Sequence, residues 1–229
     1  MTRNQYAIIV AGGKGTRMNS TVPKQFMELN GLPVLMHTIN AFYDYSEKIN
    51  IILVLPESDI ETWQQLCTRH NFTKSLTVTP GGDSRFESVK NGLNKINGTE
   101  GLVAIHDGVR PLVTADIIGA SFRLASIHQS AIAVVRLKES IRITDQDTTK
   151  AVDRSSYRLI QTPQTFALNL IKEAYNIKEA QELTDDASVA EKAGFKISLF
   201  EGSYENLKIT TPEDLIIAEA LLNNRKNRG

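Results

Sequence analysis

The stretch YAIIVAGGKGTRM, residues 6–18, decides the fold. Its first half is a continuous apolar run, which predicts a buried β-strand. Its second half is a glycine-rich loop, and Lys14, Arg17 and Lys24 place cationic side chains in and after it. Glycines let the backbone approach an anion closely, and a strand that runs into such a loop is typical of phosphate sites. The stretch therefore predicts a polyphosphate site in an α/β protein.

Two familiar phosphate motifs do not fit this loop. A P-loop needs Lys and then Ser or Thr after its last glycine, whereas Gly15 is followed by Thr16. A dinucleotide fingerprint needs a third glycine at the position of Met18. Glycines combined with cations favour a charged triphosphate over a dinucleotide. The alternative is an ordinary strand-to-helix turn with cations on its surface.

The composition is that of an ordinary globular protein. The chain has 229 residues, of which 41% are hydrophobic and 23% charged, and we expect a single domain over residues 1–229. A formal net charge of zero argues against broad binding to nucleic acid or anionic membranes. Cys67 is the only cysteine, so no disulfide can form within the chain. There is no signal-peptide pattern and no apolar run long enough to span a bilayer, and we expect a cytoplasmic protein.

Apolar runs alternate with helical patterns over residues 6–135. Strands are expected at 49–55, 76–79, 101–105 and 131–135, and helices at 34–43, 60–70, 86–96 and 114–127. This alternation predicts a mainly parallel sheet with helices on both faces. Ligands of such sheets bind at the carboxyl ends of the strands. The loops at 11–18, 80–85 and 106–111 should therefore converge on one nucleotide-sized site.

The alternation stops after residue 135. Residues 136–161 are polar and irregular, with a turn pattern at 145–148, and they predict a projecting β-arm. Because an isolated two-stranded arm is marginal in water, we expect it to pack on another surface such as a second subunit. The alternative is a mobile surface loop. Further helices are expected at 166–178, 187–193 and 212–223, and further strands at 196–200 and 206–209.

Asp107 is the candidate metal ligand. It closes a buried strand, and Mg²⁺ prefers a few protein oxygens together with phosphates and water. The alternative is an ion pair with Arg110 that only braces the loop. The neighbouring His106 should point the other way along the strand, and we expect it to be structural.

The other candidate residues lie on loops. Gly82, Asp83 and Ser88 could present backbone groups to the edge of a base. Lys208 could add a third cation at the edge of the sheet. Arg154, Thr162 and Thr184 could form a second anion pocket, although each alone is as readily a solvated side chain. No nucleophile–base triad is present, and cations with a magnesium ligand suit phosphoryl or nucleotidyl transfer.

The motifs together resemble one family. They are Ala11-Gly12-Gly13-x-Gly15-x-Arg17-Met18, Pro23-Lys24-Gln25, Gly81-Gly82-Asp83-x-Arg85-x-x-Ser88-Val89, His106-Asp107-x-x-Arg110-Pro111, Val152-Asp153-Arg154, Gln161-Thr162-Pro163-Gln164-x-Phe166, Thr184-Asp185-Asp186-Ala187-Ser188 and Asn206-x-Lys208-Ile209-Thr210-x-Pro212-Glu213-Asp214. In this order, from residue 6 to about residue 220, the chain resembles the 2-C-methyl-D-erythritol 4-phosphate cytidylyltransferases of non-mevalonate isoprenoid biosynthesis.

This resemblance implies a Rossmann-like fold, a homodimer joined by the β-arms, and an enzyme that uses CTP and Mg²⁺ and releases pyrophosphate. It assigns a role to each candidate residue. Arg17 and Lys24 would stabilise the transition state, and Lys208 would contact the reacting phosphates. The triphosphate would be cradled by Ala11, Gly12, Gly13 and Gly15, the nucleoside would be held by Gly82, Asp83 and Ser88, and Mg²⁺ would be bound by Asp107. The acceptor phosphate would be bound by Arg154 from the partner's arm together with Thr162, Thr184 and Arg110.

Three alternatives remain open. A ribitol-5-phosphate cytidylyltransferase would share the fold and the reaction, although Lys138 and Arg142 in the arm favour the isoprenoid enzyme. A sugar-1-phosphate nucleotidyltransferase usually carries a longer C-terminal region. A regulator would bind CTP without releasing pyrophosphate, and Lys24, Asp107 and Lys208 argue against it.

Overall fold

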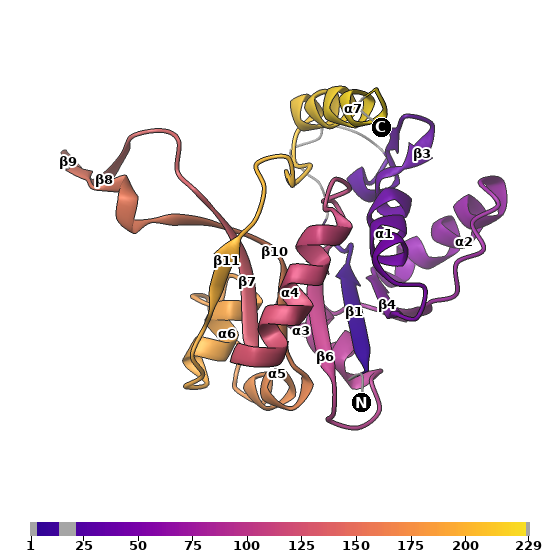
Figure 1. Cartoon of the computed structure of the whole chain (residues 1–229), viewed down its shortest axis with the longest axis horizontal. Coiled ribbons are helices and arrows are strands. Elements are labelled where there is room, and N and C mark those ends of the chain that lie inside the picture. Colours follow the sequence, from indigo (N-terminus) through magenta and orange to yellow (C-terminus); the bar gives the residue numbers. More distant parts are fainter. Residues whose placement is uncertain (1–3, 14–21, 228–229) are drawn as a thin grey trace.

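The computed structural model describes residues 4–13 and 22–227, in which a sheet of seven strands is flanked by helices (Figure 1). The strands lie in the order β11-β7-β10-β6-β1-β4-β5. Their bounds are β1 Gln5–Val10, β4 Asn50–Leu55, β5 Thr77–Pro80, β6 Leu102–Asp107, β7 Ser130–Arg136, β10 Arg158–Ala167 and β11 Leu199–Glu201.

Most neighbouring strands of this sheet run parallel. β1 pairs in parallel with β4 and β6, β4 with β5, and β11 with β7. β10 runs antiparallel to both of its neighbours, β6 and β7. The predicted α/β fold with a mainly parallel, Rossmann-like sheet is confirmed. Because β1, β4, β5 and β6 are parallel, the loops that follow them leave the sheet at the same edge.

Helices cover both faces of the sheet. They are α1 Val34–Tyr45, α2 Ile60–Arg69, α3 Arg85–Asn94, α4 Ala115–His128, α5 Leu168–Ala174, α6 Asp186–Lys192 and α7 Pro212–Lys226. Successive residues of β1 point to opposite faces, so Ile8 packs in the cluster with α3, α5 and α6, whereas Ile9 packs with α1, α2 and α4. A third apolar cluster joins Ala218 of α7 to Val109 and Leu29, and α7 lies at the end of the sheet where β1 ends (Figure 1).

The predicted β-arm is present and projects away from the sheet (Figure 1). β8 Ile141–Asp145 and β9 Thr148–Val152 pair antiparallel as a separate two-stranded sheet. The turn between them contains Gln146 with φ of 40°, as expected for a tight hairpin turn. The arm is shorter than residues 136–161, because residues 158–161 already belong to β10 in the central sheet.

β10 was not predicted, because this strand carries polar side chains at buried positions. It also takes up the first residues of the helix expected at 166–178, which begins later and ends earlier, as α5. Gln161, Thr162, Gln164 and Thr165 are all buried, and each side chain forms hydrogen bonds inside the protein. Buried polar groups are stable when paired, but they leave no apolar run in the sequence.

The strand expected at 206–209 was also wrong. This segment is not part of a sheet, and its backbone is joined to the turn after β6 by a hydrogen bond from Ile209 N to Val109 O, 2.9 Å long. The small hairpin formed by β2 Glu28–Leu29 and β3 Leu32–Pro33 had no prediction. Within the described residues, no helix has both the length and the apolar character needed to cross a membrane.

Candidate active site

The ends of β1, β5 and β6 surround a cavity of about 310 Å³. Its lining in the described part of the chain is Val10, Ala11, Gly12, Gly13, Lys24, Gln25, Gly82, Asp83, Ser84, Arg85, Ser88, Asp107, Val109 and Lys208. The expected convergence of three loops is therefore confirmed for the described residues. Lys14, Gly15 and Arg17 lie outside the described residues.

The turn after β5 is closed tightly on the start of α3. Ser84 caps the helix by accepting from Glu87 N at 3.0 Å, and Glu87 Oε2 accepts from Asp83 N at 2.8 Å. Ser88 Oγ accepts from Gly82 N at 3.2 Å. A Cβ on Gly82 would lie 2.4 Å from Glu87 Cβ, so this turn needs glycine for lack of space. The turn thus presents its backbone to the cavity in one fixed conformation.

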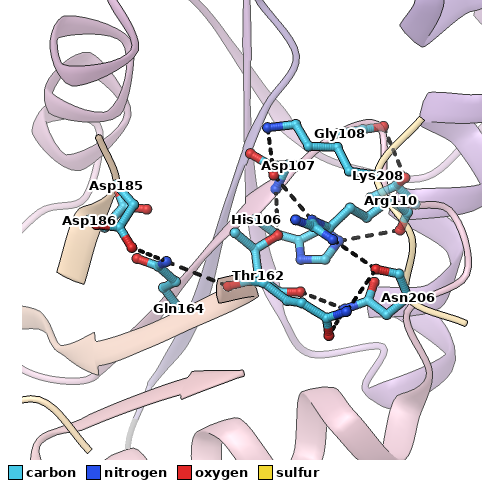
Figure 2. A network of polar contacts seen from close by, with 12 residues as sticks. His106, Asp107, Gly108, Arg110, Thr162, Gln164, Asp185, Asp186, Asn206 and Lys208 are labelled. Atoms are coloured by element: carbon cyan, nitrogen blue, oxygen red, sulfur yellow. Dashed lines mark hydrogen bonds and ion pairs between the residues drawn. The ribbon is translucent and has the colours of Figure 1, made fainter. Parts of the chain in front are cut away.

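Asp107 ends β6 with its carboxylate among three cations. Oδ2 lies 3.2 Å from Arg110 Nε and 3.1 Å from Lys208 Nζ, and Oδ1 lies 3.9 Å from Arg85 Nε. Figure 2 shows Lys208 and Arg110 meeting at this carboxylate. Burial alone would raise the pKa of Asp107, but the three cations outweigh it and hold the pKa well below its usual range. Asp107 is therefore an anion at neutral pH.

A buried hydrogen-bond network fixes this arrangement from behind (Figure 2). Asp107 N donates to Thr162 Oγ1 at 3.1 Å, and Asn206 Nδ2 donates to Thr162 O at 2.8 Å. Arg110 Nη1 donates to Asn206 O at 2.8 Å. The unexpected strand β10 and the segment before α7 are thereby tied to the end of β6. This explains why Asn206 stands two residues before Lys208.

His106 is buried behind the carboxylate and does not line the cavity. Its Nε2 lies 3.4 Å from Arg110 O, and its ring packs edge-on against Phe42. Burial lowers the pKa of His106 to about 3, so the imidazole is neutral. These features support the expectation that His106 is structural.

The residues present fit a single Mg²⁺ held mainly by phosphates. The described residues contain no cluster of three or more His, Cys, Asp or Glu side chains that could cage a metal. Asp107 supplies an ionised carboxylate at the cavity, and its Oδ1 accepts no hydrogen bond from the described residues. One carboxylate with an open oxygen suits Mg²⁺, which keeps most of its ligands as phosphate and water.

Lys24 and Gln25 also line the cavity and lie in a short 3₁₀ turn at Lys24–Phe26. A Cβ on Gly13 would lie 3.4 Å from Lys24 Cε, so the lysine side chain lies against the backbone of the glycine loop. Gln25 is buried, and its Nε2 donates to Asp59 Oδ2 at 2.9 Å. This amide anchors the turn that carries Lys24.

The sequence matches the family model of 2-C-methyl-D-erythritol 4-phosphate cytidylyltransferase over residues 5–224. The chain belongs to this family. The protein of that name from Bacteroides thetaiotaomicron is 49% identical over 218 residues, covering 95% of this chain and 99% of that protein. The one from Bacteroides fragilis is 47% identical over 216 residues, covering 94% and 98%.

Solved structures agree with the family assignment. The Francisella tularensis enzyme of the same name is 31% identical with a TM-score of 0.79, covering 95% of this chain and 99% of that one. The 4-diphosphocytidyl-2C-methyl-D-erythritol synthase from Anaerococcus prevotii is 29% identical with a TM-score of 0.83, covering 96% of each chain. The chain is therefore a cytidylyltransferase, an enzyme of the nucleotidyltransferase class, and the resemblance stated from its motifs is confirmed.

The cytidylyltransferase chain does not bring all the predicted residues into its own cavity. Arg154 is exposed at the base of the arm, where its guanidinium donates to Lys138 O. Thr184 is exposed just before α6. Arg110 is buried, and its donors are directed at Asp107 and Asn206. Its predicted contact with the acceptor stays a prediction, and its geometry is that of a brace for Asp107.

Three residues of the site had no predicted role. Asn206 joins Thr162 to Arg110, Arg85 lies between Asp107 and α6, and Asp186 pairs with Arg85. Each of the three stands inside a motif on which the family resemblance was based, and this position in a motif was the one sequence signal for its role. Its hydrogen-bond partners in the site are 44 to 101 positions away in the sequence, so spacing alone could not reveal what it does.

Proposed function

We propose that the cavity binds CTP and that the enzyme transfers its cytidylyl group to 2-C-methyl-D-erythritol 4-phosphate, which gives 4-diphosphocytidyl-2-C-methyl-D-erythritol and pyrophosphate. One observation carries this proposal. A tight glycine turn, two lysines and an ionised carboxylate meet at one cavity at the carboxyl edge of the sheet. That set matches the parts of a nucleotide triphosphate, with backbone groups for the base and charge for the phosphates.

CTP would lie along the two glycine loops. The N–H groups of Gly82 and Asp83 are engaged by Ser88 and Glu87, so the backbone carbonyl groups of this turn would read the edge of the cytosine. Ala11, Gly12, Gly13 and Gly15 would cradle the triphosphate, because glycines allow the close approach that anion binding by backbone N–H groups requires.

Asp107 would hold Mg²⁺, and the bound ion would neutralise charge on the phosphates during transfer. The protein's own contribution is to keep the carboxylate ionised and in place. Arg110 and Lys208 hold the charge on Oδ2, and Thr162 anchors the backbone of Asp107.

The acceptor phosphate is an anion at neutral pH, so the reaction needs no general base. Its difficulty is the repulsion between two anions as one attacks the other's phosphorus. Lys24, Lys208 and Arg17 would offset this repulsion, and most strongly as charge develops at the α-phosphate. His106 is buried and does not line the cavity, which is consistent with a mechanism that does not remove a proton.

The acceptor half of the site would be completed by a second subunit. Arg154 lies at the base of the projecting arm, and Tyr157, Leu159 and Ile143 leave about half of their surface exposed nearby. Apolar side chains on a projecting arm favour association with another copy. In such a homodimer Arg154 of one arm would bind the acceptor phosphate together with Thr162 and Thr184 of its partner. A cytoplasmic location stays a prediction.

The test is pyrophosphate release with CTP and Mg²⁺, comparing 2-C-methyl-D-erythritol 4-phosphate with ribitol 5-phosphate. We expect strong preference for the first acceptor. Preference for ribitol 5-phosphate would contradict the acceptor assignment and keep the CTP site. Binding of CTP without release with either acceptor would contradict catalysis and leave a regulator.

A further inference from the structure

Arg85 lies between two carboxylates and is held unequally by them. Its Nη1 and Nη2 donate to Asp186 Oδ1 and Oδ2 at 2.9 and 2.7 Å, which is a bidentate pair. Its Nε is 3.9 Å from Asp107 Oδ1, which is beyond hydrogen-bond distance. Both carboxylates attract the guanidinium, but only Asp186 forms hydrogen bonds with it.

The position of Asp186 in this ion pair is fixed by its surroundings. It is fully buried at the start of α6, and Tyr175 Oη donates to its Oδ1 at 2.7 Å. Tyr175 is itself buried and stacks on Phe86, with ring centroids 4.6 Å apart. Because Phe86 follows Arg85 in α3, the same packing fixes both ends of the ion pair. A bidentate pair between Arg and a carboxylate is rigid as well as strong.

The unequal hold leaves one carboxylate oxygen of Asp107, a residue that lines the cavity, without a hydrogen bond from the described residues. Asp107 Oδ2 is engaged by Arg110 and Lys208, whereas Oδ1 meets only the distant Nε of Arg85 among the described residues. A movement of Arg85 by about 1 Å would turn that distant contact into a charge-assisted hydrogen bond. Such a bond would occupy the oxygen that a divalent cation needs.

We propose that Asp186 is a positioning residue that holds Arg85 away from Asp107 and so keeps Oδ1 available to the divalent cation. This inference rests on the proposed role of Asp107 in metal binding. Asp186 contributes the counter-charge, and Arg85 is the group through which it acts. Without that counter-charge, Asp107 becomes the nearest carboxylate for the guanidinium, and Arg85 competes with the cation.

The test measures how much Mn²⁺ tightens the binding of CTP. Calorimetry gives the dissociation constant of CTP with a chelator and with Mn²⁺, and the ratio of the two reports the metal alone. Any direct effect of a substitution on the nucleotide cancels in this ratio. In Asp186→Asn, which keeps the shape of the side chain, we expect the ratio to fall about tenfold, the effect of losing one oxygen ligand to a competing cation.

A second substitution separates positioning from folding. In Asp186→Asn combined with Arg85→Gln, the competing cation is gone, and we expect the ratio to return to within about threefold of the wild type. Tyr175→Phe is the matched control, because it removes a hydrogen bond from Asp186 and keeps both charges. Its ratio should stay within about twofold. Thermal unfolding of each variant confirms that it is folded.

Each outcome decides a different point. If Mn²⁺ does not tighten CTP binding in the wild type, or still does so in Asp107→Asn, the metal assignment is wrong and this inference falls with it. If those two controls behave as expected and Asp186→Asn keeps the wild-type ratio, the inference alone is wrong. A double variant as weak as Asp186→Asn also overturns it, because Asp186 would then not act through Arg85. Should Asp186→Asn not fold, a tenfold loss in Arg85→Gln alone would overturn it.

Discussion

The cavity and the arm differ in which side chains they bury and which they expose. At the cavity, the carboxylate of Asp107 is buried and is held by Arg110 and Lys208. On the arm and at its base, apolar side chains are exposed, with Ile143 at 56% and Leu159 at 52%. Under the proposed function, the nucleotide half of the site is preformed in one chain, whereas the acceptor half would be completed by a second subunit that covers these apolar side chains.

Removing a cation from the preformed half should have the largest effect. In Lys24→Ala we expect kcat to fall on the order of 10²–10³, the scale for losing one preorganised charge donor. Pyrophosphate release measures it, and Lys24→Arg, which keeps the charge, should lose much less. Activity within a few-fold of the wild type in Lys24→Ala would remove Lys24 from the transition state.

Adding a methyl group to the turn after β5, which would hold the base, should weaken CTP binding and have a smaller effect than the loss of Lys24. In Gly82→Ala the new Cβ would lie 2.4 Å from Glu87 Cβ, so the turn must shift. We expect KM for CTP to rise about tenfold, equivalent to about 1.4 kcal/mol of binding. The control is Gly119→Ala in α4, outside the cavity lining, where the new Cβ would lie 3.2 Å from Tyr45 Cε2 and a much smaller rise is expected. Equal effects of the two substitutions would show that the shape of the base turn does not matter.

A charge at the base of the arm should affect assembly rather than the nucleotide site. In Leu159→Asp we expect the dimer to dissociate about tenfold more readily, since a charge would be buried without a partner. Analytical ultracentrifugation measures this. Ile216→Asp is the matched control, because Ile216 is also exposed and belongs to α7, which lies away from the arm (Figure 1). A dimer weakened only by the Ile216 substitution would place the interface elsewhere.

The smallest effect should come from the network behind the carboxylate. Thr162→Val removes the hydroxyl that accepts from Asp107 N and leaves that buried N–H unpaired. We expect the free energy of unfolding to fall by about 1 kcal/mol relative to the wild type, whose threonine has nearly the same shape as valine. Urea unfolding compares the two. Equal stability would mean that Thr162 does not support Asp107.

The first half of the fold was predictable from the sequence, and the reason is physical. The strands β1, β4, β6 and β7 are apolar runs, and the helices between them bury apolar side chains. β10 was not predictable, because its buried positions carry Gln161 and Thr162, whose hydrogen bonds form only in the folded chain. The same holds for the site. The loops and Asp107 could be placed because they follow strands, whereas the pair of Arg85 with Asp186 depends on packing across 101 positions.

The most direct test of the shared site mixes two defective subunits. A heterodimer of one Lys24→Ala subunit and one Arg154→Ala subunit can be isolated with two different tags. If Arg154 acts in the partner's cavity, one of the two sites regains both residues, and we expect about half of the wild-type activity. If Arg154 acts in its own cavity, each site keeps one defect. A heterodimer no more active than the two defective homodimers would then contradict the account.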